Sequence, residues 1–202
     1  MAERIYLIRH GETDSNAARI VQTPETPLSE RGREQARRVG ARLAAAGIDA
    51  ILSSDLERAH ETARAIAAAT GKEIDLDASL QERNFGDLRG TPYTELREDI
   101  FAHDFTPPGG ENGTVFDARV AQAWERVLQQ AEATDGILAV VSHGLVLRGL
   151  AEHCLDTSGH EPDSDWANTC VTIVTPTPPY PVERLACTEH LEGTSGAPGG
   201  IA

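Results

Sequence analysis

The sequence predicts an α/β fold of three layers, α/β/α, with a mostly parallel central sheet. Short apolar runs that are typical of buried strands alternate along the chain with segments whose apolar residues recur at helical spacing. Alternating strands and helices favour parallel pairing, with the connecting helices packed on both faces of the sheet. At 202 residues and 40% hydrophobic content, the chain fits one domain with a single core.

The first half of the chain is expected to contain three strands and two helices. For the first helix, Ser29 is a typical N-cap residue and Gly47 a typical glycine at the C-terminal end. Asp55 and Gly71 are expected to delimit the second helix in the same way. The expected elements are a strand at 5–8, a helix at 30–46, a strand at 50–52, a helix at 55–69 and a short strand at 73–76.

The segment at 87–112 interrupts the alternation. It contains three prolines and ends in the run Pro107-Pro108-Gly109-Gly110 before the next helix. We expect one short helix in it, at 93–103. Because long irregular segments inside compact domains are often functional, we predict that it is an insertion that folds over a crevice as a small lid.

The second half returns to alternating helices and strands. The expected elements are a helix at 115–133, a strand at 137–141, a helix at 145–155, a strand nearer an edge at 169–174 and a further strand at 184–187. We expect residues 1–191 to form the single domain. The remaining residues, 192–202, are rich in Gly, Ser and Ala and are predicted to be a disordered tail.

Composition excludes several classes of partner. The net charge of −14 argues against nucleic acid, whose phosphate backbone requires a basic face. No apolar run is long enough to span a bilayer and no leader-like segment opens the chain, so we expect a cytoplasmic protein without a membrane partner. The three cysteines have the spacing of neither a disulfide framework nor a metal site. The sequence leaves the oligomeric state open, a dimer included.

Four short motifs carry the residues that indicate chemistry. Three of them follow predicted strands, and ligands of open α/β sheets bind at the carboxyl ends of the strands. Two histidines, two arginines and a glutamate are therefore expected to meet in one crevice. The motifs are Arg9-His10-Gly11-Glu12-Thr13, Ser53 to Arg58, Glu82 to Gly86, and Ser142-His143-Gly144.

On these motifs the sequence resembles the histidine phosphatase superfamily, which also contains the cofactor-dependent phosphoglycerate mutases and fructose-2,6-bisphosphatase. Arg9-His10-Gly11 matches the signature triplet of that family. The resemblance covers roughly the first nine-tenths of the chain and implies a phosphoglycerate mutase-like fold. Further matching positions are Thr13, Asn16, Leu28 to Gly32, Ala59, Thr62-Ala63, Pro108 to Glu111, Asn168 and His190-Leu191.

The resemblance implies a role for each catalytic candidate. His10 is the nucleophile, because a neutral imidazole nitrogen can attack phosphorus and form a covalent intermediate. Arg9 and Arg58 clamp the phosphoryl group with paired donors, and His143 hydrogen-bonds one of its oxygens. Glu82 is the general acid that protonates the leaving group, a role that requires a raised pKa.

Other positions are candidates for substrate contact or for support. The glycines at 11 and 144 are expected to allow close approach of the phosphate. By resemblance, Asn16, Gln22 and Thr23 lie on a loop that lines the pocket, although a plain polar loop is an equal alternative. The chain departs from the family here, since it lacks a glycine after Gln22. Glu12 is an alternative general acid, and Glu111 is a lid anchor, a helix cap or a further catalytic group.

These residues favour hydrolysis of a small phosphorylated metabolite, without metal or other cofactor. The alternative is a cofactor-dependent phosphoglycerate mutase. Against it, the basic pair expected after Glu82 is absent, so a carboxylate-bearing sugar acid would find little to pair with. A second alternative, a catalytically silent phosphate-binding protein, ranks last because the nucleophile and both clamps are present.

Overall fold

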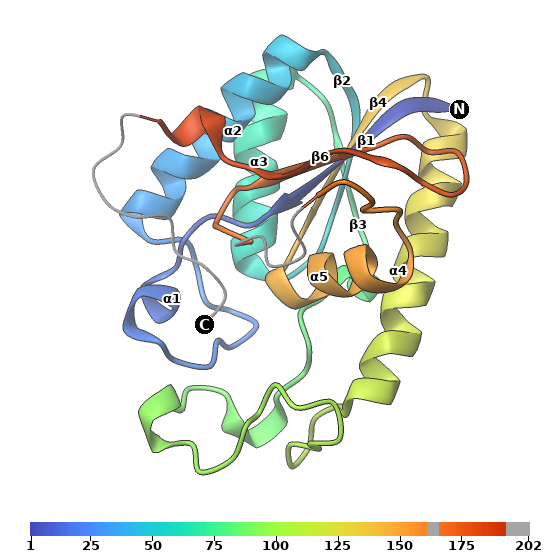
Figure 1. The fold of residues 1–202 in the computed structure, drawn as a ribbon. Helices are drawn as coiled ribbons and strands as arrows, with labels where there is room; N and C mark the ends of the chain where they lie inside the picture. The colour runs from blue at the N-terminus through green and yellow to red at the C-terminus, as the bar shows by residue number, and fades with distance from the viewer. Residues whose placement is uncertain (161–165, 193–202) are drawn as a thin grey trace.

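The computed structural model describes residues 1–160 and 166–192. Its centre is a six-stranded sheet in the order β3-β2-β4-β1-β5-β6 (Figure 1). The four strands β3, β2, β4 and β1 are mutually parallel, β5 runs antiparallel to β1, and β6 runs antiparallel to β5. The mostly parallel α/β sheet predicted from the sequence is confirmed. The strands are β1 (Ala2–Arg9), β2 (Ile48–Ser53), β3 (Ile74–Leu76), β4 (Gly136–Ser142), β5 (Val171–Val174) and β6 (Val182–Cys187).

Helices cover both faces of this sheet. On one face, α2 (Glu30–Ala46) and α3 (Glu57–Thr70) pack on each other, and on the other face lie α4 (Gly113–Ala133) and α5 (Gly144–His153). The side chains of β1 alternate between the two layers, as a pleated strand requires. Leu7 joins the cluster of α4 and α5, and Ile8 joins the cluster of α2 and α3.

The ends of the first long helix follow the sequence prediction. The Ser29 hydroxyl accepts a hydrogen bond from the Gly32 amide at 3.0 Å, and Gly47 ends α2 with φ of 78°. The predicted cap of α3 is wrong by one residue, because the N-cap is Leu56 and no side chain caps the helix. The Asp55 carboxylate instead accepts a hydrogen bond from the Gln81 side chain, which lies outside the helix, at 2.7 Å.

The lid segment differs from its prediction. Only a 3-10 turn at Tyr93–Glu95 forms where a helix at 93–103 was expected. The physical reason is tertiary packing, which overrides helical spacing. Ile100 is buried in a small separate cluster with Val21 and Phe85, and the nearby ring of Phe101 packs edge-on against Phe85.

A short helix, α1 (Asp14–Ala18), follows β1 and was not predicted. Its sequence signal is a capping box. Thr13 accepts from the Asn16 amide, and the Asn16 side chain accepts from the Thr13 amide in return. The loop around α1 and the segment at 81–112 lie next to each other below the sheet (Figure 1).

The strand predicted near an edge lies second from that edge. Its alternating sequence does not expose it, because Thr172 is buried and accepts a hydrogen bond from the Ala186 amide of β6. The disordered tail was predicted at 192–202. Of these residues, 193–202 lie outside the described part of the chain.

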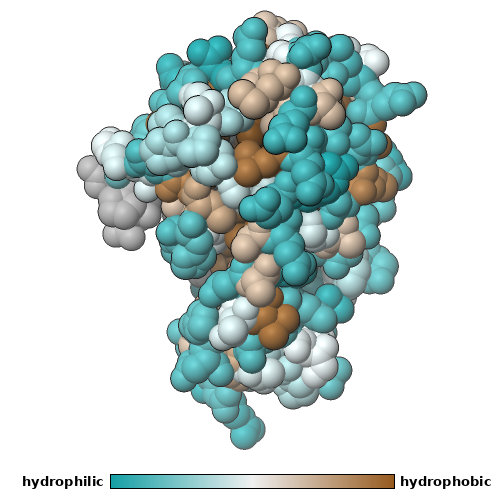
Figure 2. All heavy atoms as spheres, turned by 90° about the vertical axis from the view of Figure 1, so that its right-hand side faces the viewer, coloured by the Kyte–Doolittle hydropathy of each residue, from teal (hydrophilic) through white to brown (hydrophobic). Residues whose placement is uncertain are grey.

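The surface is mainly polar. The face on the α4 side is mostly hydrophilic with small scattered apolar patches (Figure 2). The exposed large hydrophobic residues of the described chain are Met1, Leu76 and Val115. Among the helices of residues 1–160 and 166–192, none combines the length and apolar character that a membrane crossing requires.

Candidate active site

The sheet brings the two histidines together. Arg9 is the last residue of β1 and pairs in register with Ser142, the last residue of β4, so His10 and His143 leave neighbouring strands at the same level. Their ring centroids lie 5.1 Å apart, and both side chains are buried. β2 lies on the other side of β4 and leads into α3, which carries Arg58 in its first turn.

The hydrogen bonds of His10 fix its reactive form. Its Nδ1 lies 2.7 Å from the Gly11 carbonyl oxygen, which can only accept, so Nδ1 carries the proton and donates it. The other ring nitrogen, Nε2, then keeps its lone pair. Burial lowers the pKa of His10 far below its ordinary value, and Arg58 and Arg9 lower it further. The imidazole is therefore neutral and available as a nucleophile.

The main chain of His10 is held on both sides. Its amide donates to the Ser142 carbonyl at 3.0 Å, and its carbonyl accepts from the Asn168 side chain at 3.1 Å. Gly11 is required for a packing reason, because a Cβ there would lie 2.6 Å from the Gly32 carbonyl oxygen of α2. The expected role of this glycine, close approach to the phosphate, stays a prediction beside this packing constraint.

Two buried arginines flank His10. The Arg9 side chain donates to the Trp166 carbonyl, and Arg58 Nη1 donates to the Thr23 carbonyl at 3.0 Å. Burial lowers the pKa of Arg58 to about 10, with Glu82 opposing the shift and Arg9 adding to it. Within the described residues, Arg58 Nε is buried without a hydrogen-bond partner. An anion at this point would satisfy it and favour the charged guanidinium.

His143 lies behind His10 as the N-cap of α5. Its Nε2 is 2.9 Å from the Ser54 hydroxyl, and its buried Nδ1 has no hydrogen-bond partner in the described part of the protein. Burial lowers the pKa of His143 well below its ordinary value, and Arg58 and His10 add to the effect. In the unliganded site His143 is therefore neutral.

Glu82 reaches the same site from the loop after β3. Its carboxylate accepts from the Arg83 amide at 3.0 Å and from the Leu145 amide, in the first turn of α5, at 3.2 Å. Burial raises the pKa of Glu82, while these two amides and Arg58 oppose the shift. A carboxyl group with a raised pKa can carry the proton that a general acid donates.

Glu12 does not substitute for Glu82. Its carboxylate is bound to the start of α2, by the Ser29 hydroxyl at 3.1 Å and by Arg31 at 3.1 Å. It does not line the cavity in front of His10. These contacts are those of a structural link, and they favour Glu82 over Glu12 as the acid.

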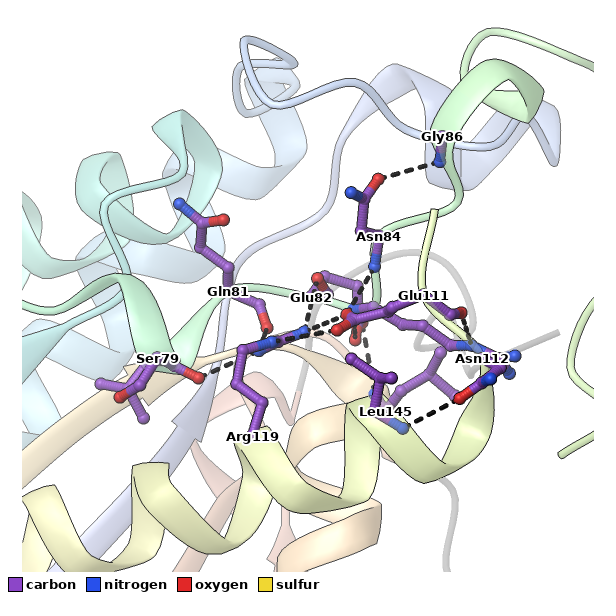
Figure 3. Close-up of polar contacts among 12 residues, drawn as sticks. Ser79, Gln81, Glu82, Asn84, Gly86, Glu111, Asn112, Arg119 and Leu145 are labelled. Carbon is purple, nitrogen blue, oxygen red and sulfur yellow. Dashed lines mark hydrogen bonds and ion pairs between the residues drawn. The ribbon is translucent and has the colours of Figure 1, made fainter. Parts of the chain in front are cut away.

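Arg119, which forms an ion pair with Glu111, also binds the segment that carries Glu82 (Figure 3). Arg119 of α4 donates to the carbonyls of Gln81 at 2.6 Å, Ser79 at 3.0 Å and Glu82 at 3.2 Å. The same guanidinium pairs with the Glu111 carboxylate, which in turn accepts from the Asn84 amide at 2.8 Å. Of the roles considered for Glu111, the structure supports anchoring of the lid.

A cavity of about 70 Å³ opens in front of His10. This is less than half of the roughly 150 Å³ of a cavity that holds benzene, so the enclosed part fits a group of phosphoryl size. His143 and Gly11 do not line it. The residues of the predicted site that do are Arg9, His10, Asn16, Gln22, Thr23, Arg58, Glu82 and Gly144.

Residues 5–186 match the model of the histidine phosphatase superfamily (branch 1). The chain belongs to this superfamily. A "Probable phosphoglycerate mutase GpmB" of Salmonella paratyphi B is 36% identical over 154 residues, which are 71% of each chain.

Two solved structures extend the comparison of this superfamily member. A protein named YhfR of Bacillus stearothermophilus superposes with a TM-score of 0.80 at 29% identity, over 94% of this chain and 99% of that one. A putative α-ribazole-5′-phosphate phosphatase of Escherichia coli gives 0.78 at 28%, over 93% and 97%. The neighbours thus include both phosphatases and phosphoglycerate mutase-like proteins.

Sequence reasoning missed part of this cavity. Arg19, Arg89 and Tyr93 line it from the loop after α1 and from the lid, together with Arg83 and Phe101. A local signal existed only for the lid aromatics, whose clustering in sequence is visible. Nothing in the sequence shows which lid arginine faces inwards, because that depends on how two loops dock.

The polar loop of the site has mixed roles. The Thr13 hydroxyl lies 3.1 Å from the side-chain oxygen of Asn16 and 2.9 Å from that of Gln22, and its one proton can be donated to either. Thr23 offers its carbonyl to Arg58. In residues 1–160 and 166–192, no three His, Cys, Asp or Glu side chains gather in a way that could hold a metal ion.

Proposed function

We propose that this histidine phosphatase is a phosphomonoester hydrolase that works through a phosphohistidine on His10, without metal or other cofactor. The observation that carries the proposal is the state of His10. Its Nδ1 proton is committed to the Gly11 carbonyl and its pKa is lowered, so Nε2 has a free lone pair at neutral pH. A buried neutral imidazole between two arginines suits attack on a phosphoryl group.

In the first step, His10 Nε2 forms a bond to phosphorus and the bond from phosphorus to the ester oxygen breaks. Arg9 and Arg58 neutralise the charge on the equatorial oxygens, and His143 donates a hydrogen bond to one of them. Glu82 gives its proton to the departing alkoxide, so the product leaves as an alcohol.

In the second step, water replaces the alcohol. The Glu82 carboxylate, now ionised, takes a proton from the water as its oxygen attacks phosphorus. The bond from Nε2 to phosphorus breaks, and its electron pair returns to the imidazole. Inorganic phosphate leaves, and both His10 and Glu82 regain their starting protonation.

The test is phosphate release from a panel of small phosphomonoesters in the presence of EDTA, with His10→Ala as the comparison. We expect release by the wild type, loss of at least about 10³-fold in the variant, and no effect of the chelator. Loss of activity with EDTA that Mg²⁺ or Zn²⁺ restores would contradict the metal-independent mechanism.

A mutase is the second candidate, and one observation favours it. The expectation that a sugar acid would find little to pair with is wrong, because Arg19 and Arg89 line the cavity in addition to the two clamps. Interconversion of 2- and 3-phosphoglycerate that depends on bisphosphoglycerate and outpaces phosphate release would establish the mutase instead.

A further inference from the structure

The turn from Trp166 to Thr169, called here the supporting turn, binds the main chain of the nucleophile. The Asn168 side chain donates to the His10 carbonyl at 3.1 Å. The Thr169 amide lies 3.2 Å from the same carbonyl oxygen and 3.1 Å from that of Arg9. The Trp166 carbonyl accepts from the Arg9 side chain. One short segment therefore holds both the nucleophile and one of the two arginines beside it.

The supporting turn is strained at Thr169. Its φ is 58°, in the left-handed region, where a β-branched residue is rarely found. Such a conformation persists only where the surrounding contacts determine it. The residue is fully buried, so its hydroxyl group requires a partner within the protein. The contact made by this hydroxyl therefore bears on where the turn places its donors to the nucleophile.

His190 makes that contact. Its Nε2 lies 3.1 Å from the Thr169 hydroxyl, and its Nδ1 lies 3.2 Å from Nη1 of Arg42 on α2. A guanidinium can only donate, so Nδ1 accepts, and the proton of the neutral ring is on Nε2, which donates to the hydroxyl. Burial lowers the pKa of His190 to about 4, and Arg42 and Arg38 add to the shift. The ring is therefore neutral near pH 7 and present as one tautomer.

The hydrogen bonds of His190 join distant parts of the chain. The residue lies in the 3-10 turn η4 (Glu189–Leu191), which packs on α2 and is drawn in red beside it in Figure 1. The Arg42 guanidinium is fixed in turn, because both of its Nη atoms lie 3.4 Å from the Cys187 sulfur. The hydrogen bonds thus run in one direction, from α2 through η4 to the supporting turn and from there to the nucleophile.

We infer that His190 and Thr169 are positioning residues for the nucleophile: their hydrogen bond sets the supporting turn, and the turn places the His10 ring for attack on phosphorus. The inference rests on the proposed function, since it assigns that attack to His10. Neither positioning residue lines the cavity in front of His10. Misplacement of a reacting group by about 1 Å can lower a rate about 10²-fold. Loss of the hydrogen bond should therefore slow the attack equally for all phosphomonoesters.

The pair Thr169→Val and Thr169→Ser separates the hydroxyl group from the shape of the residue. Valine keeps the β-branched shape but cannot accept from His190, whereas serine keeps the hydroxyl. By rapid quenching with p-nitrophenyl phosphate, we expect the rate constant of phosphoenzyme formation to fall about 10- to 100-fold in Thr169→Val. In Thr169→Ser it should stay close to the wild-type value. A merely structural role would lower the amount of phosphoenzyme, through the folded fraction, and leave the rate constant unchanged.

Variants of His190 test the other partner of the same bond. His190→Phe keeps a ring but removes both hydrogen bonds, and it should slow phosphoenzyme formation as Thr169→Val does. His190→Gln should restore most of the rate, because its amide N–H can replace that of Nε2. The double variant Thr169→Val/His190→Phe should be no slower than the slower single variant, since both lose one shared bond. His60→Phe is the control, because His60 also contacts an arginine, Arg64 at 3.3 Å, but on the surface of α3.

Nitrogen NMR of the histidine rings tests the contact without turnover. In the wild type, we expect the signals of His190 to show an unprotonated Nδ1 and a protonated Nε2. The ring signals of His10 should shift in His190→Phe and in Thr169→Val, and they should stay unchanged in His60→Phe.

Equal rate constants of phosphoenzyme formation in Thr169→Val and Thr169→Ser would overturn the inference. So would His10 ring signals that are the same in the wild type and in His190→Phe. Failure of the hydrolase has a different signature. If no phosphoenzyme forms even in the wild type, while the His10 signals still respond to His190→Phe, the hydrolase is removed and the positioning of His10 by His190 remains.

Discussion

The two sides of the cavity are built in different ways. On the side proposed to hold the phosphoryl group, Arg9 and His10 line the cavity at the end of β1, and His143 lies next to His10 at the end of β4, where parallel register fixes their relative height. On the side of the leaving group, the residues come from the loop after α1 and from the lid, which contains only 3-10 turns and irregular backbone.

The two sides therefore differ in what positions their residues: strand pairing within the sheet on one side, and contacts between segments distant in sequence on the other. The phosphoryl side is held by main-chain bonds of the sheet, such as that from the His10 amide to the Ser142 carbonyl. On the other side, main-chain bonds join the loop after α1 to the lid, such as that from the Gly90 amide to the Val21 carbonyl, and side chains from elsewhere anchor the segment of Glu82, above all Arg119 of α4. Substitutions on the first side should therefore abolish chemistry on every substrate, and those on the second should act selectively.

The largest expected effect is on the phosphoryl side. Arg58→Gln removes the buried charge that stabilises the equatorial oxygens in the proposed mechanism, and we expect kcat/KM to fall about 10²–10³-fold on all phosphomonoesters alike. Arg64→Gln is the control, because Arg64 is an exposed residue of the same helix paired with Glu57. If the loss of kcat/KM in Arg58→Gln varied strongly with the leaving group, the proposed division between the two sides of the cavity would be wrong.

Glu82→Gln should act selectively. Without an acid, an alkyl phosphate must release a basic alkoxide, so we expect kcat to fall about 10²–10⁴-fold. p-Nitrophenyl phosphate releases a stable anion and should lose much less in the same variant. Glu12→Gln, in contrast, should lower thermal stability and leave this ratio unchanged. Equal losses on both esters in Glu82→Gln would remove Glu82 as the acid.

Arg119→Met should have the same selective effect as Glu82→Gln, a larger loss of activity on alkyl phosphates than on p-nitrophenyl phosphate, but a smaller one. Loss of three bonds to the carbonyls at 79, 81 and 82 misplaces the acid without removing it, and we expect a fall of about 10- to 100-fold on alkyl phosphates. Arg126→Gln is the control on the same helix, where Arg126 pairs with Asp77. Equal falls on alkyl phosphates and p-nitrophenyl phosphate in Arg119→Met would mean general damage to the site.

The smallest expected effects are changes of the wild-type kcat/KM with pH. Because the pKa of His10 is lowered, the nucleophile stays neutral and kcat/KM should not fall as pH drops just below the ordinary histidine range. As pH rises, kcat/KM should fall first through the raised pKa of Glu82, which must be protonated, and again near pH 10, where Arg58 loses its charge. An acid limb at the ordinary histidine pKa would contradict the environment found for His10.

The same difference between local and long-range contacts explains which features could be predicted from the sequence. Helix α2 was predicted with its exact bounds because Ser29, helical spacing and Gly47 are local signals. The cap of α3 and the helix at 93–103 were wrong because Gln81 engages Asp55 and the lid cluster buries Ile100, contacts made over long sequence distances. Arg19 and Arg89 could not be found for the same reason.

The central claim is that His10 carries the phosphoryl group. Rapid quenching of the wild type with p-nitrophenyl phosphate, followed by peptide mapping, tests it most directly. The account predicts an acid-labile phosphate on the peptide of His10, absent in His10→Ala, and formed as fast as the first turnover. Phosphate on another residue, or turnover with no phosphoenzyme at any quench time, would contradict it.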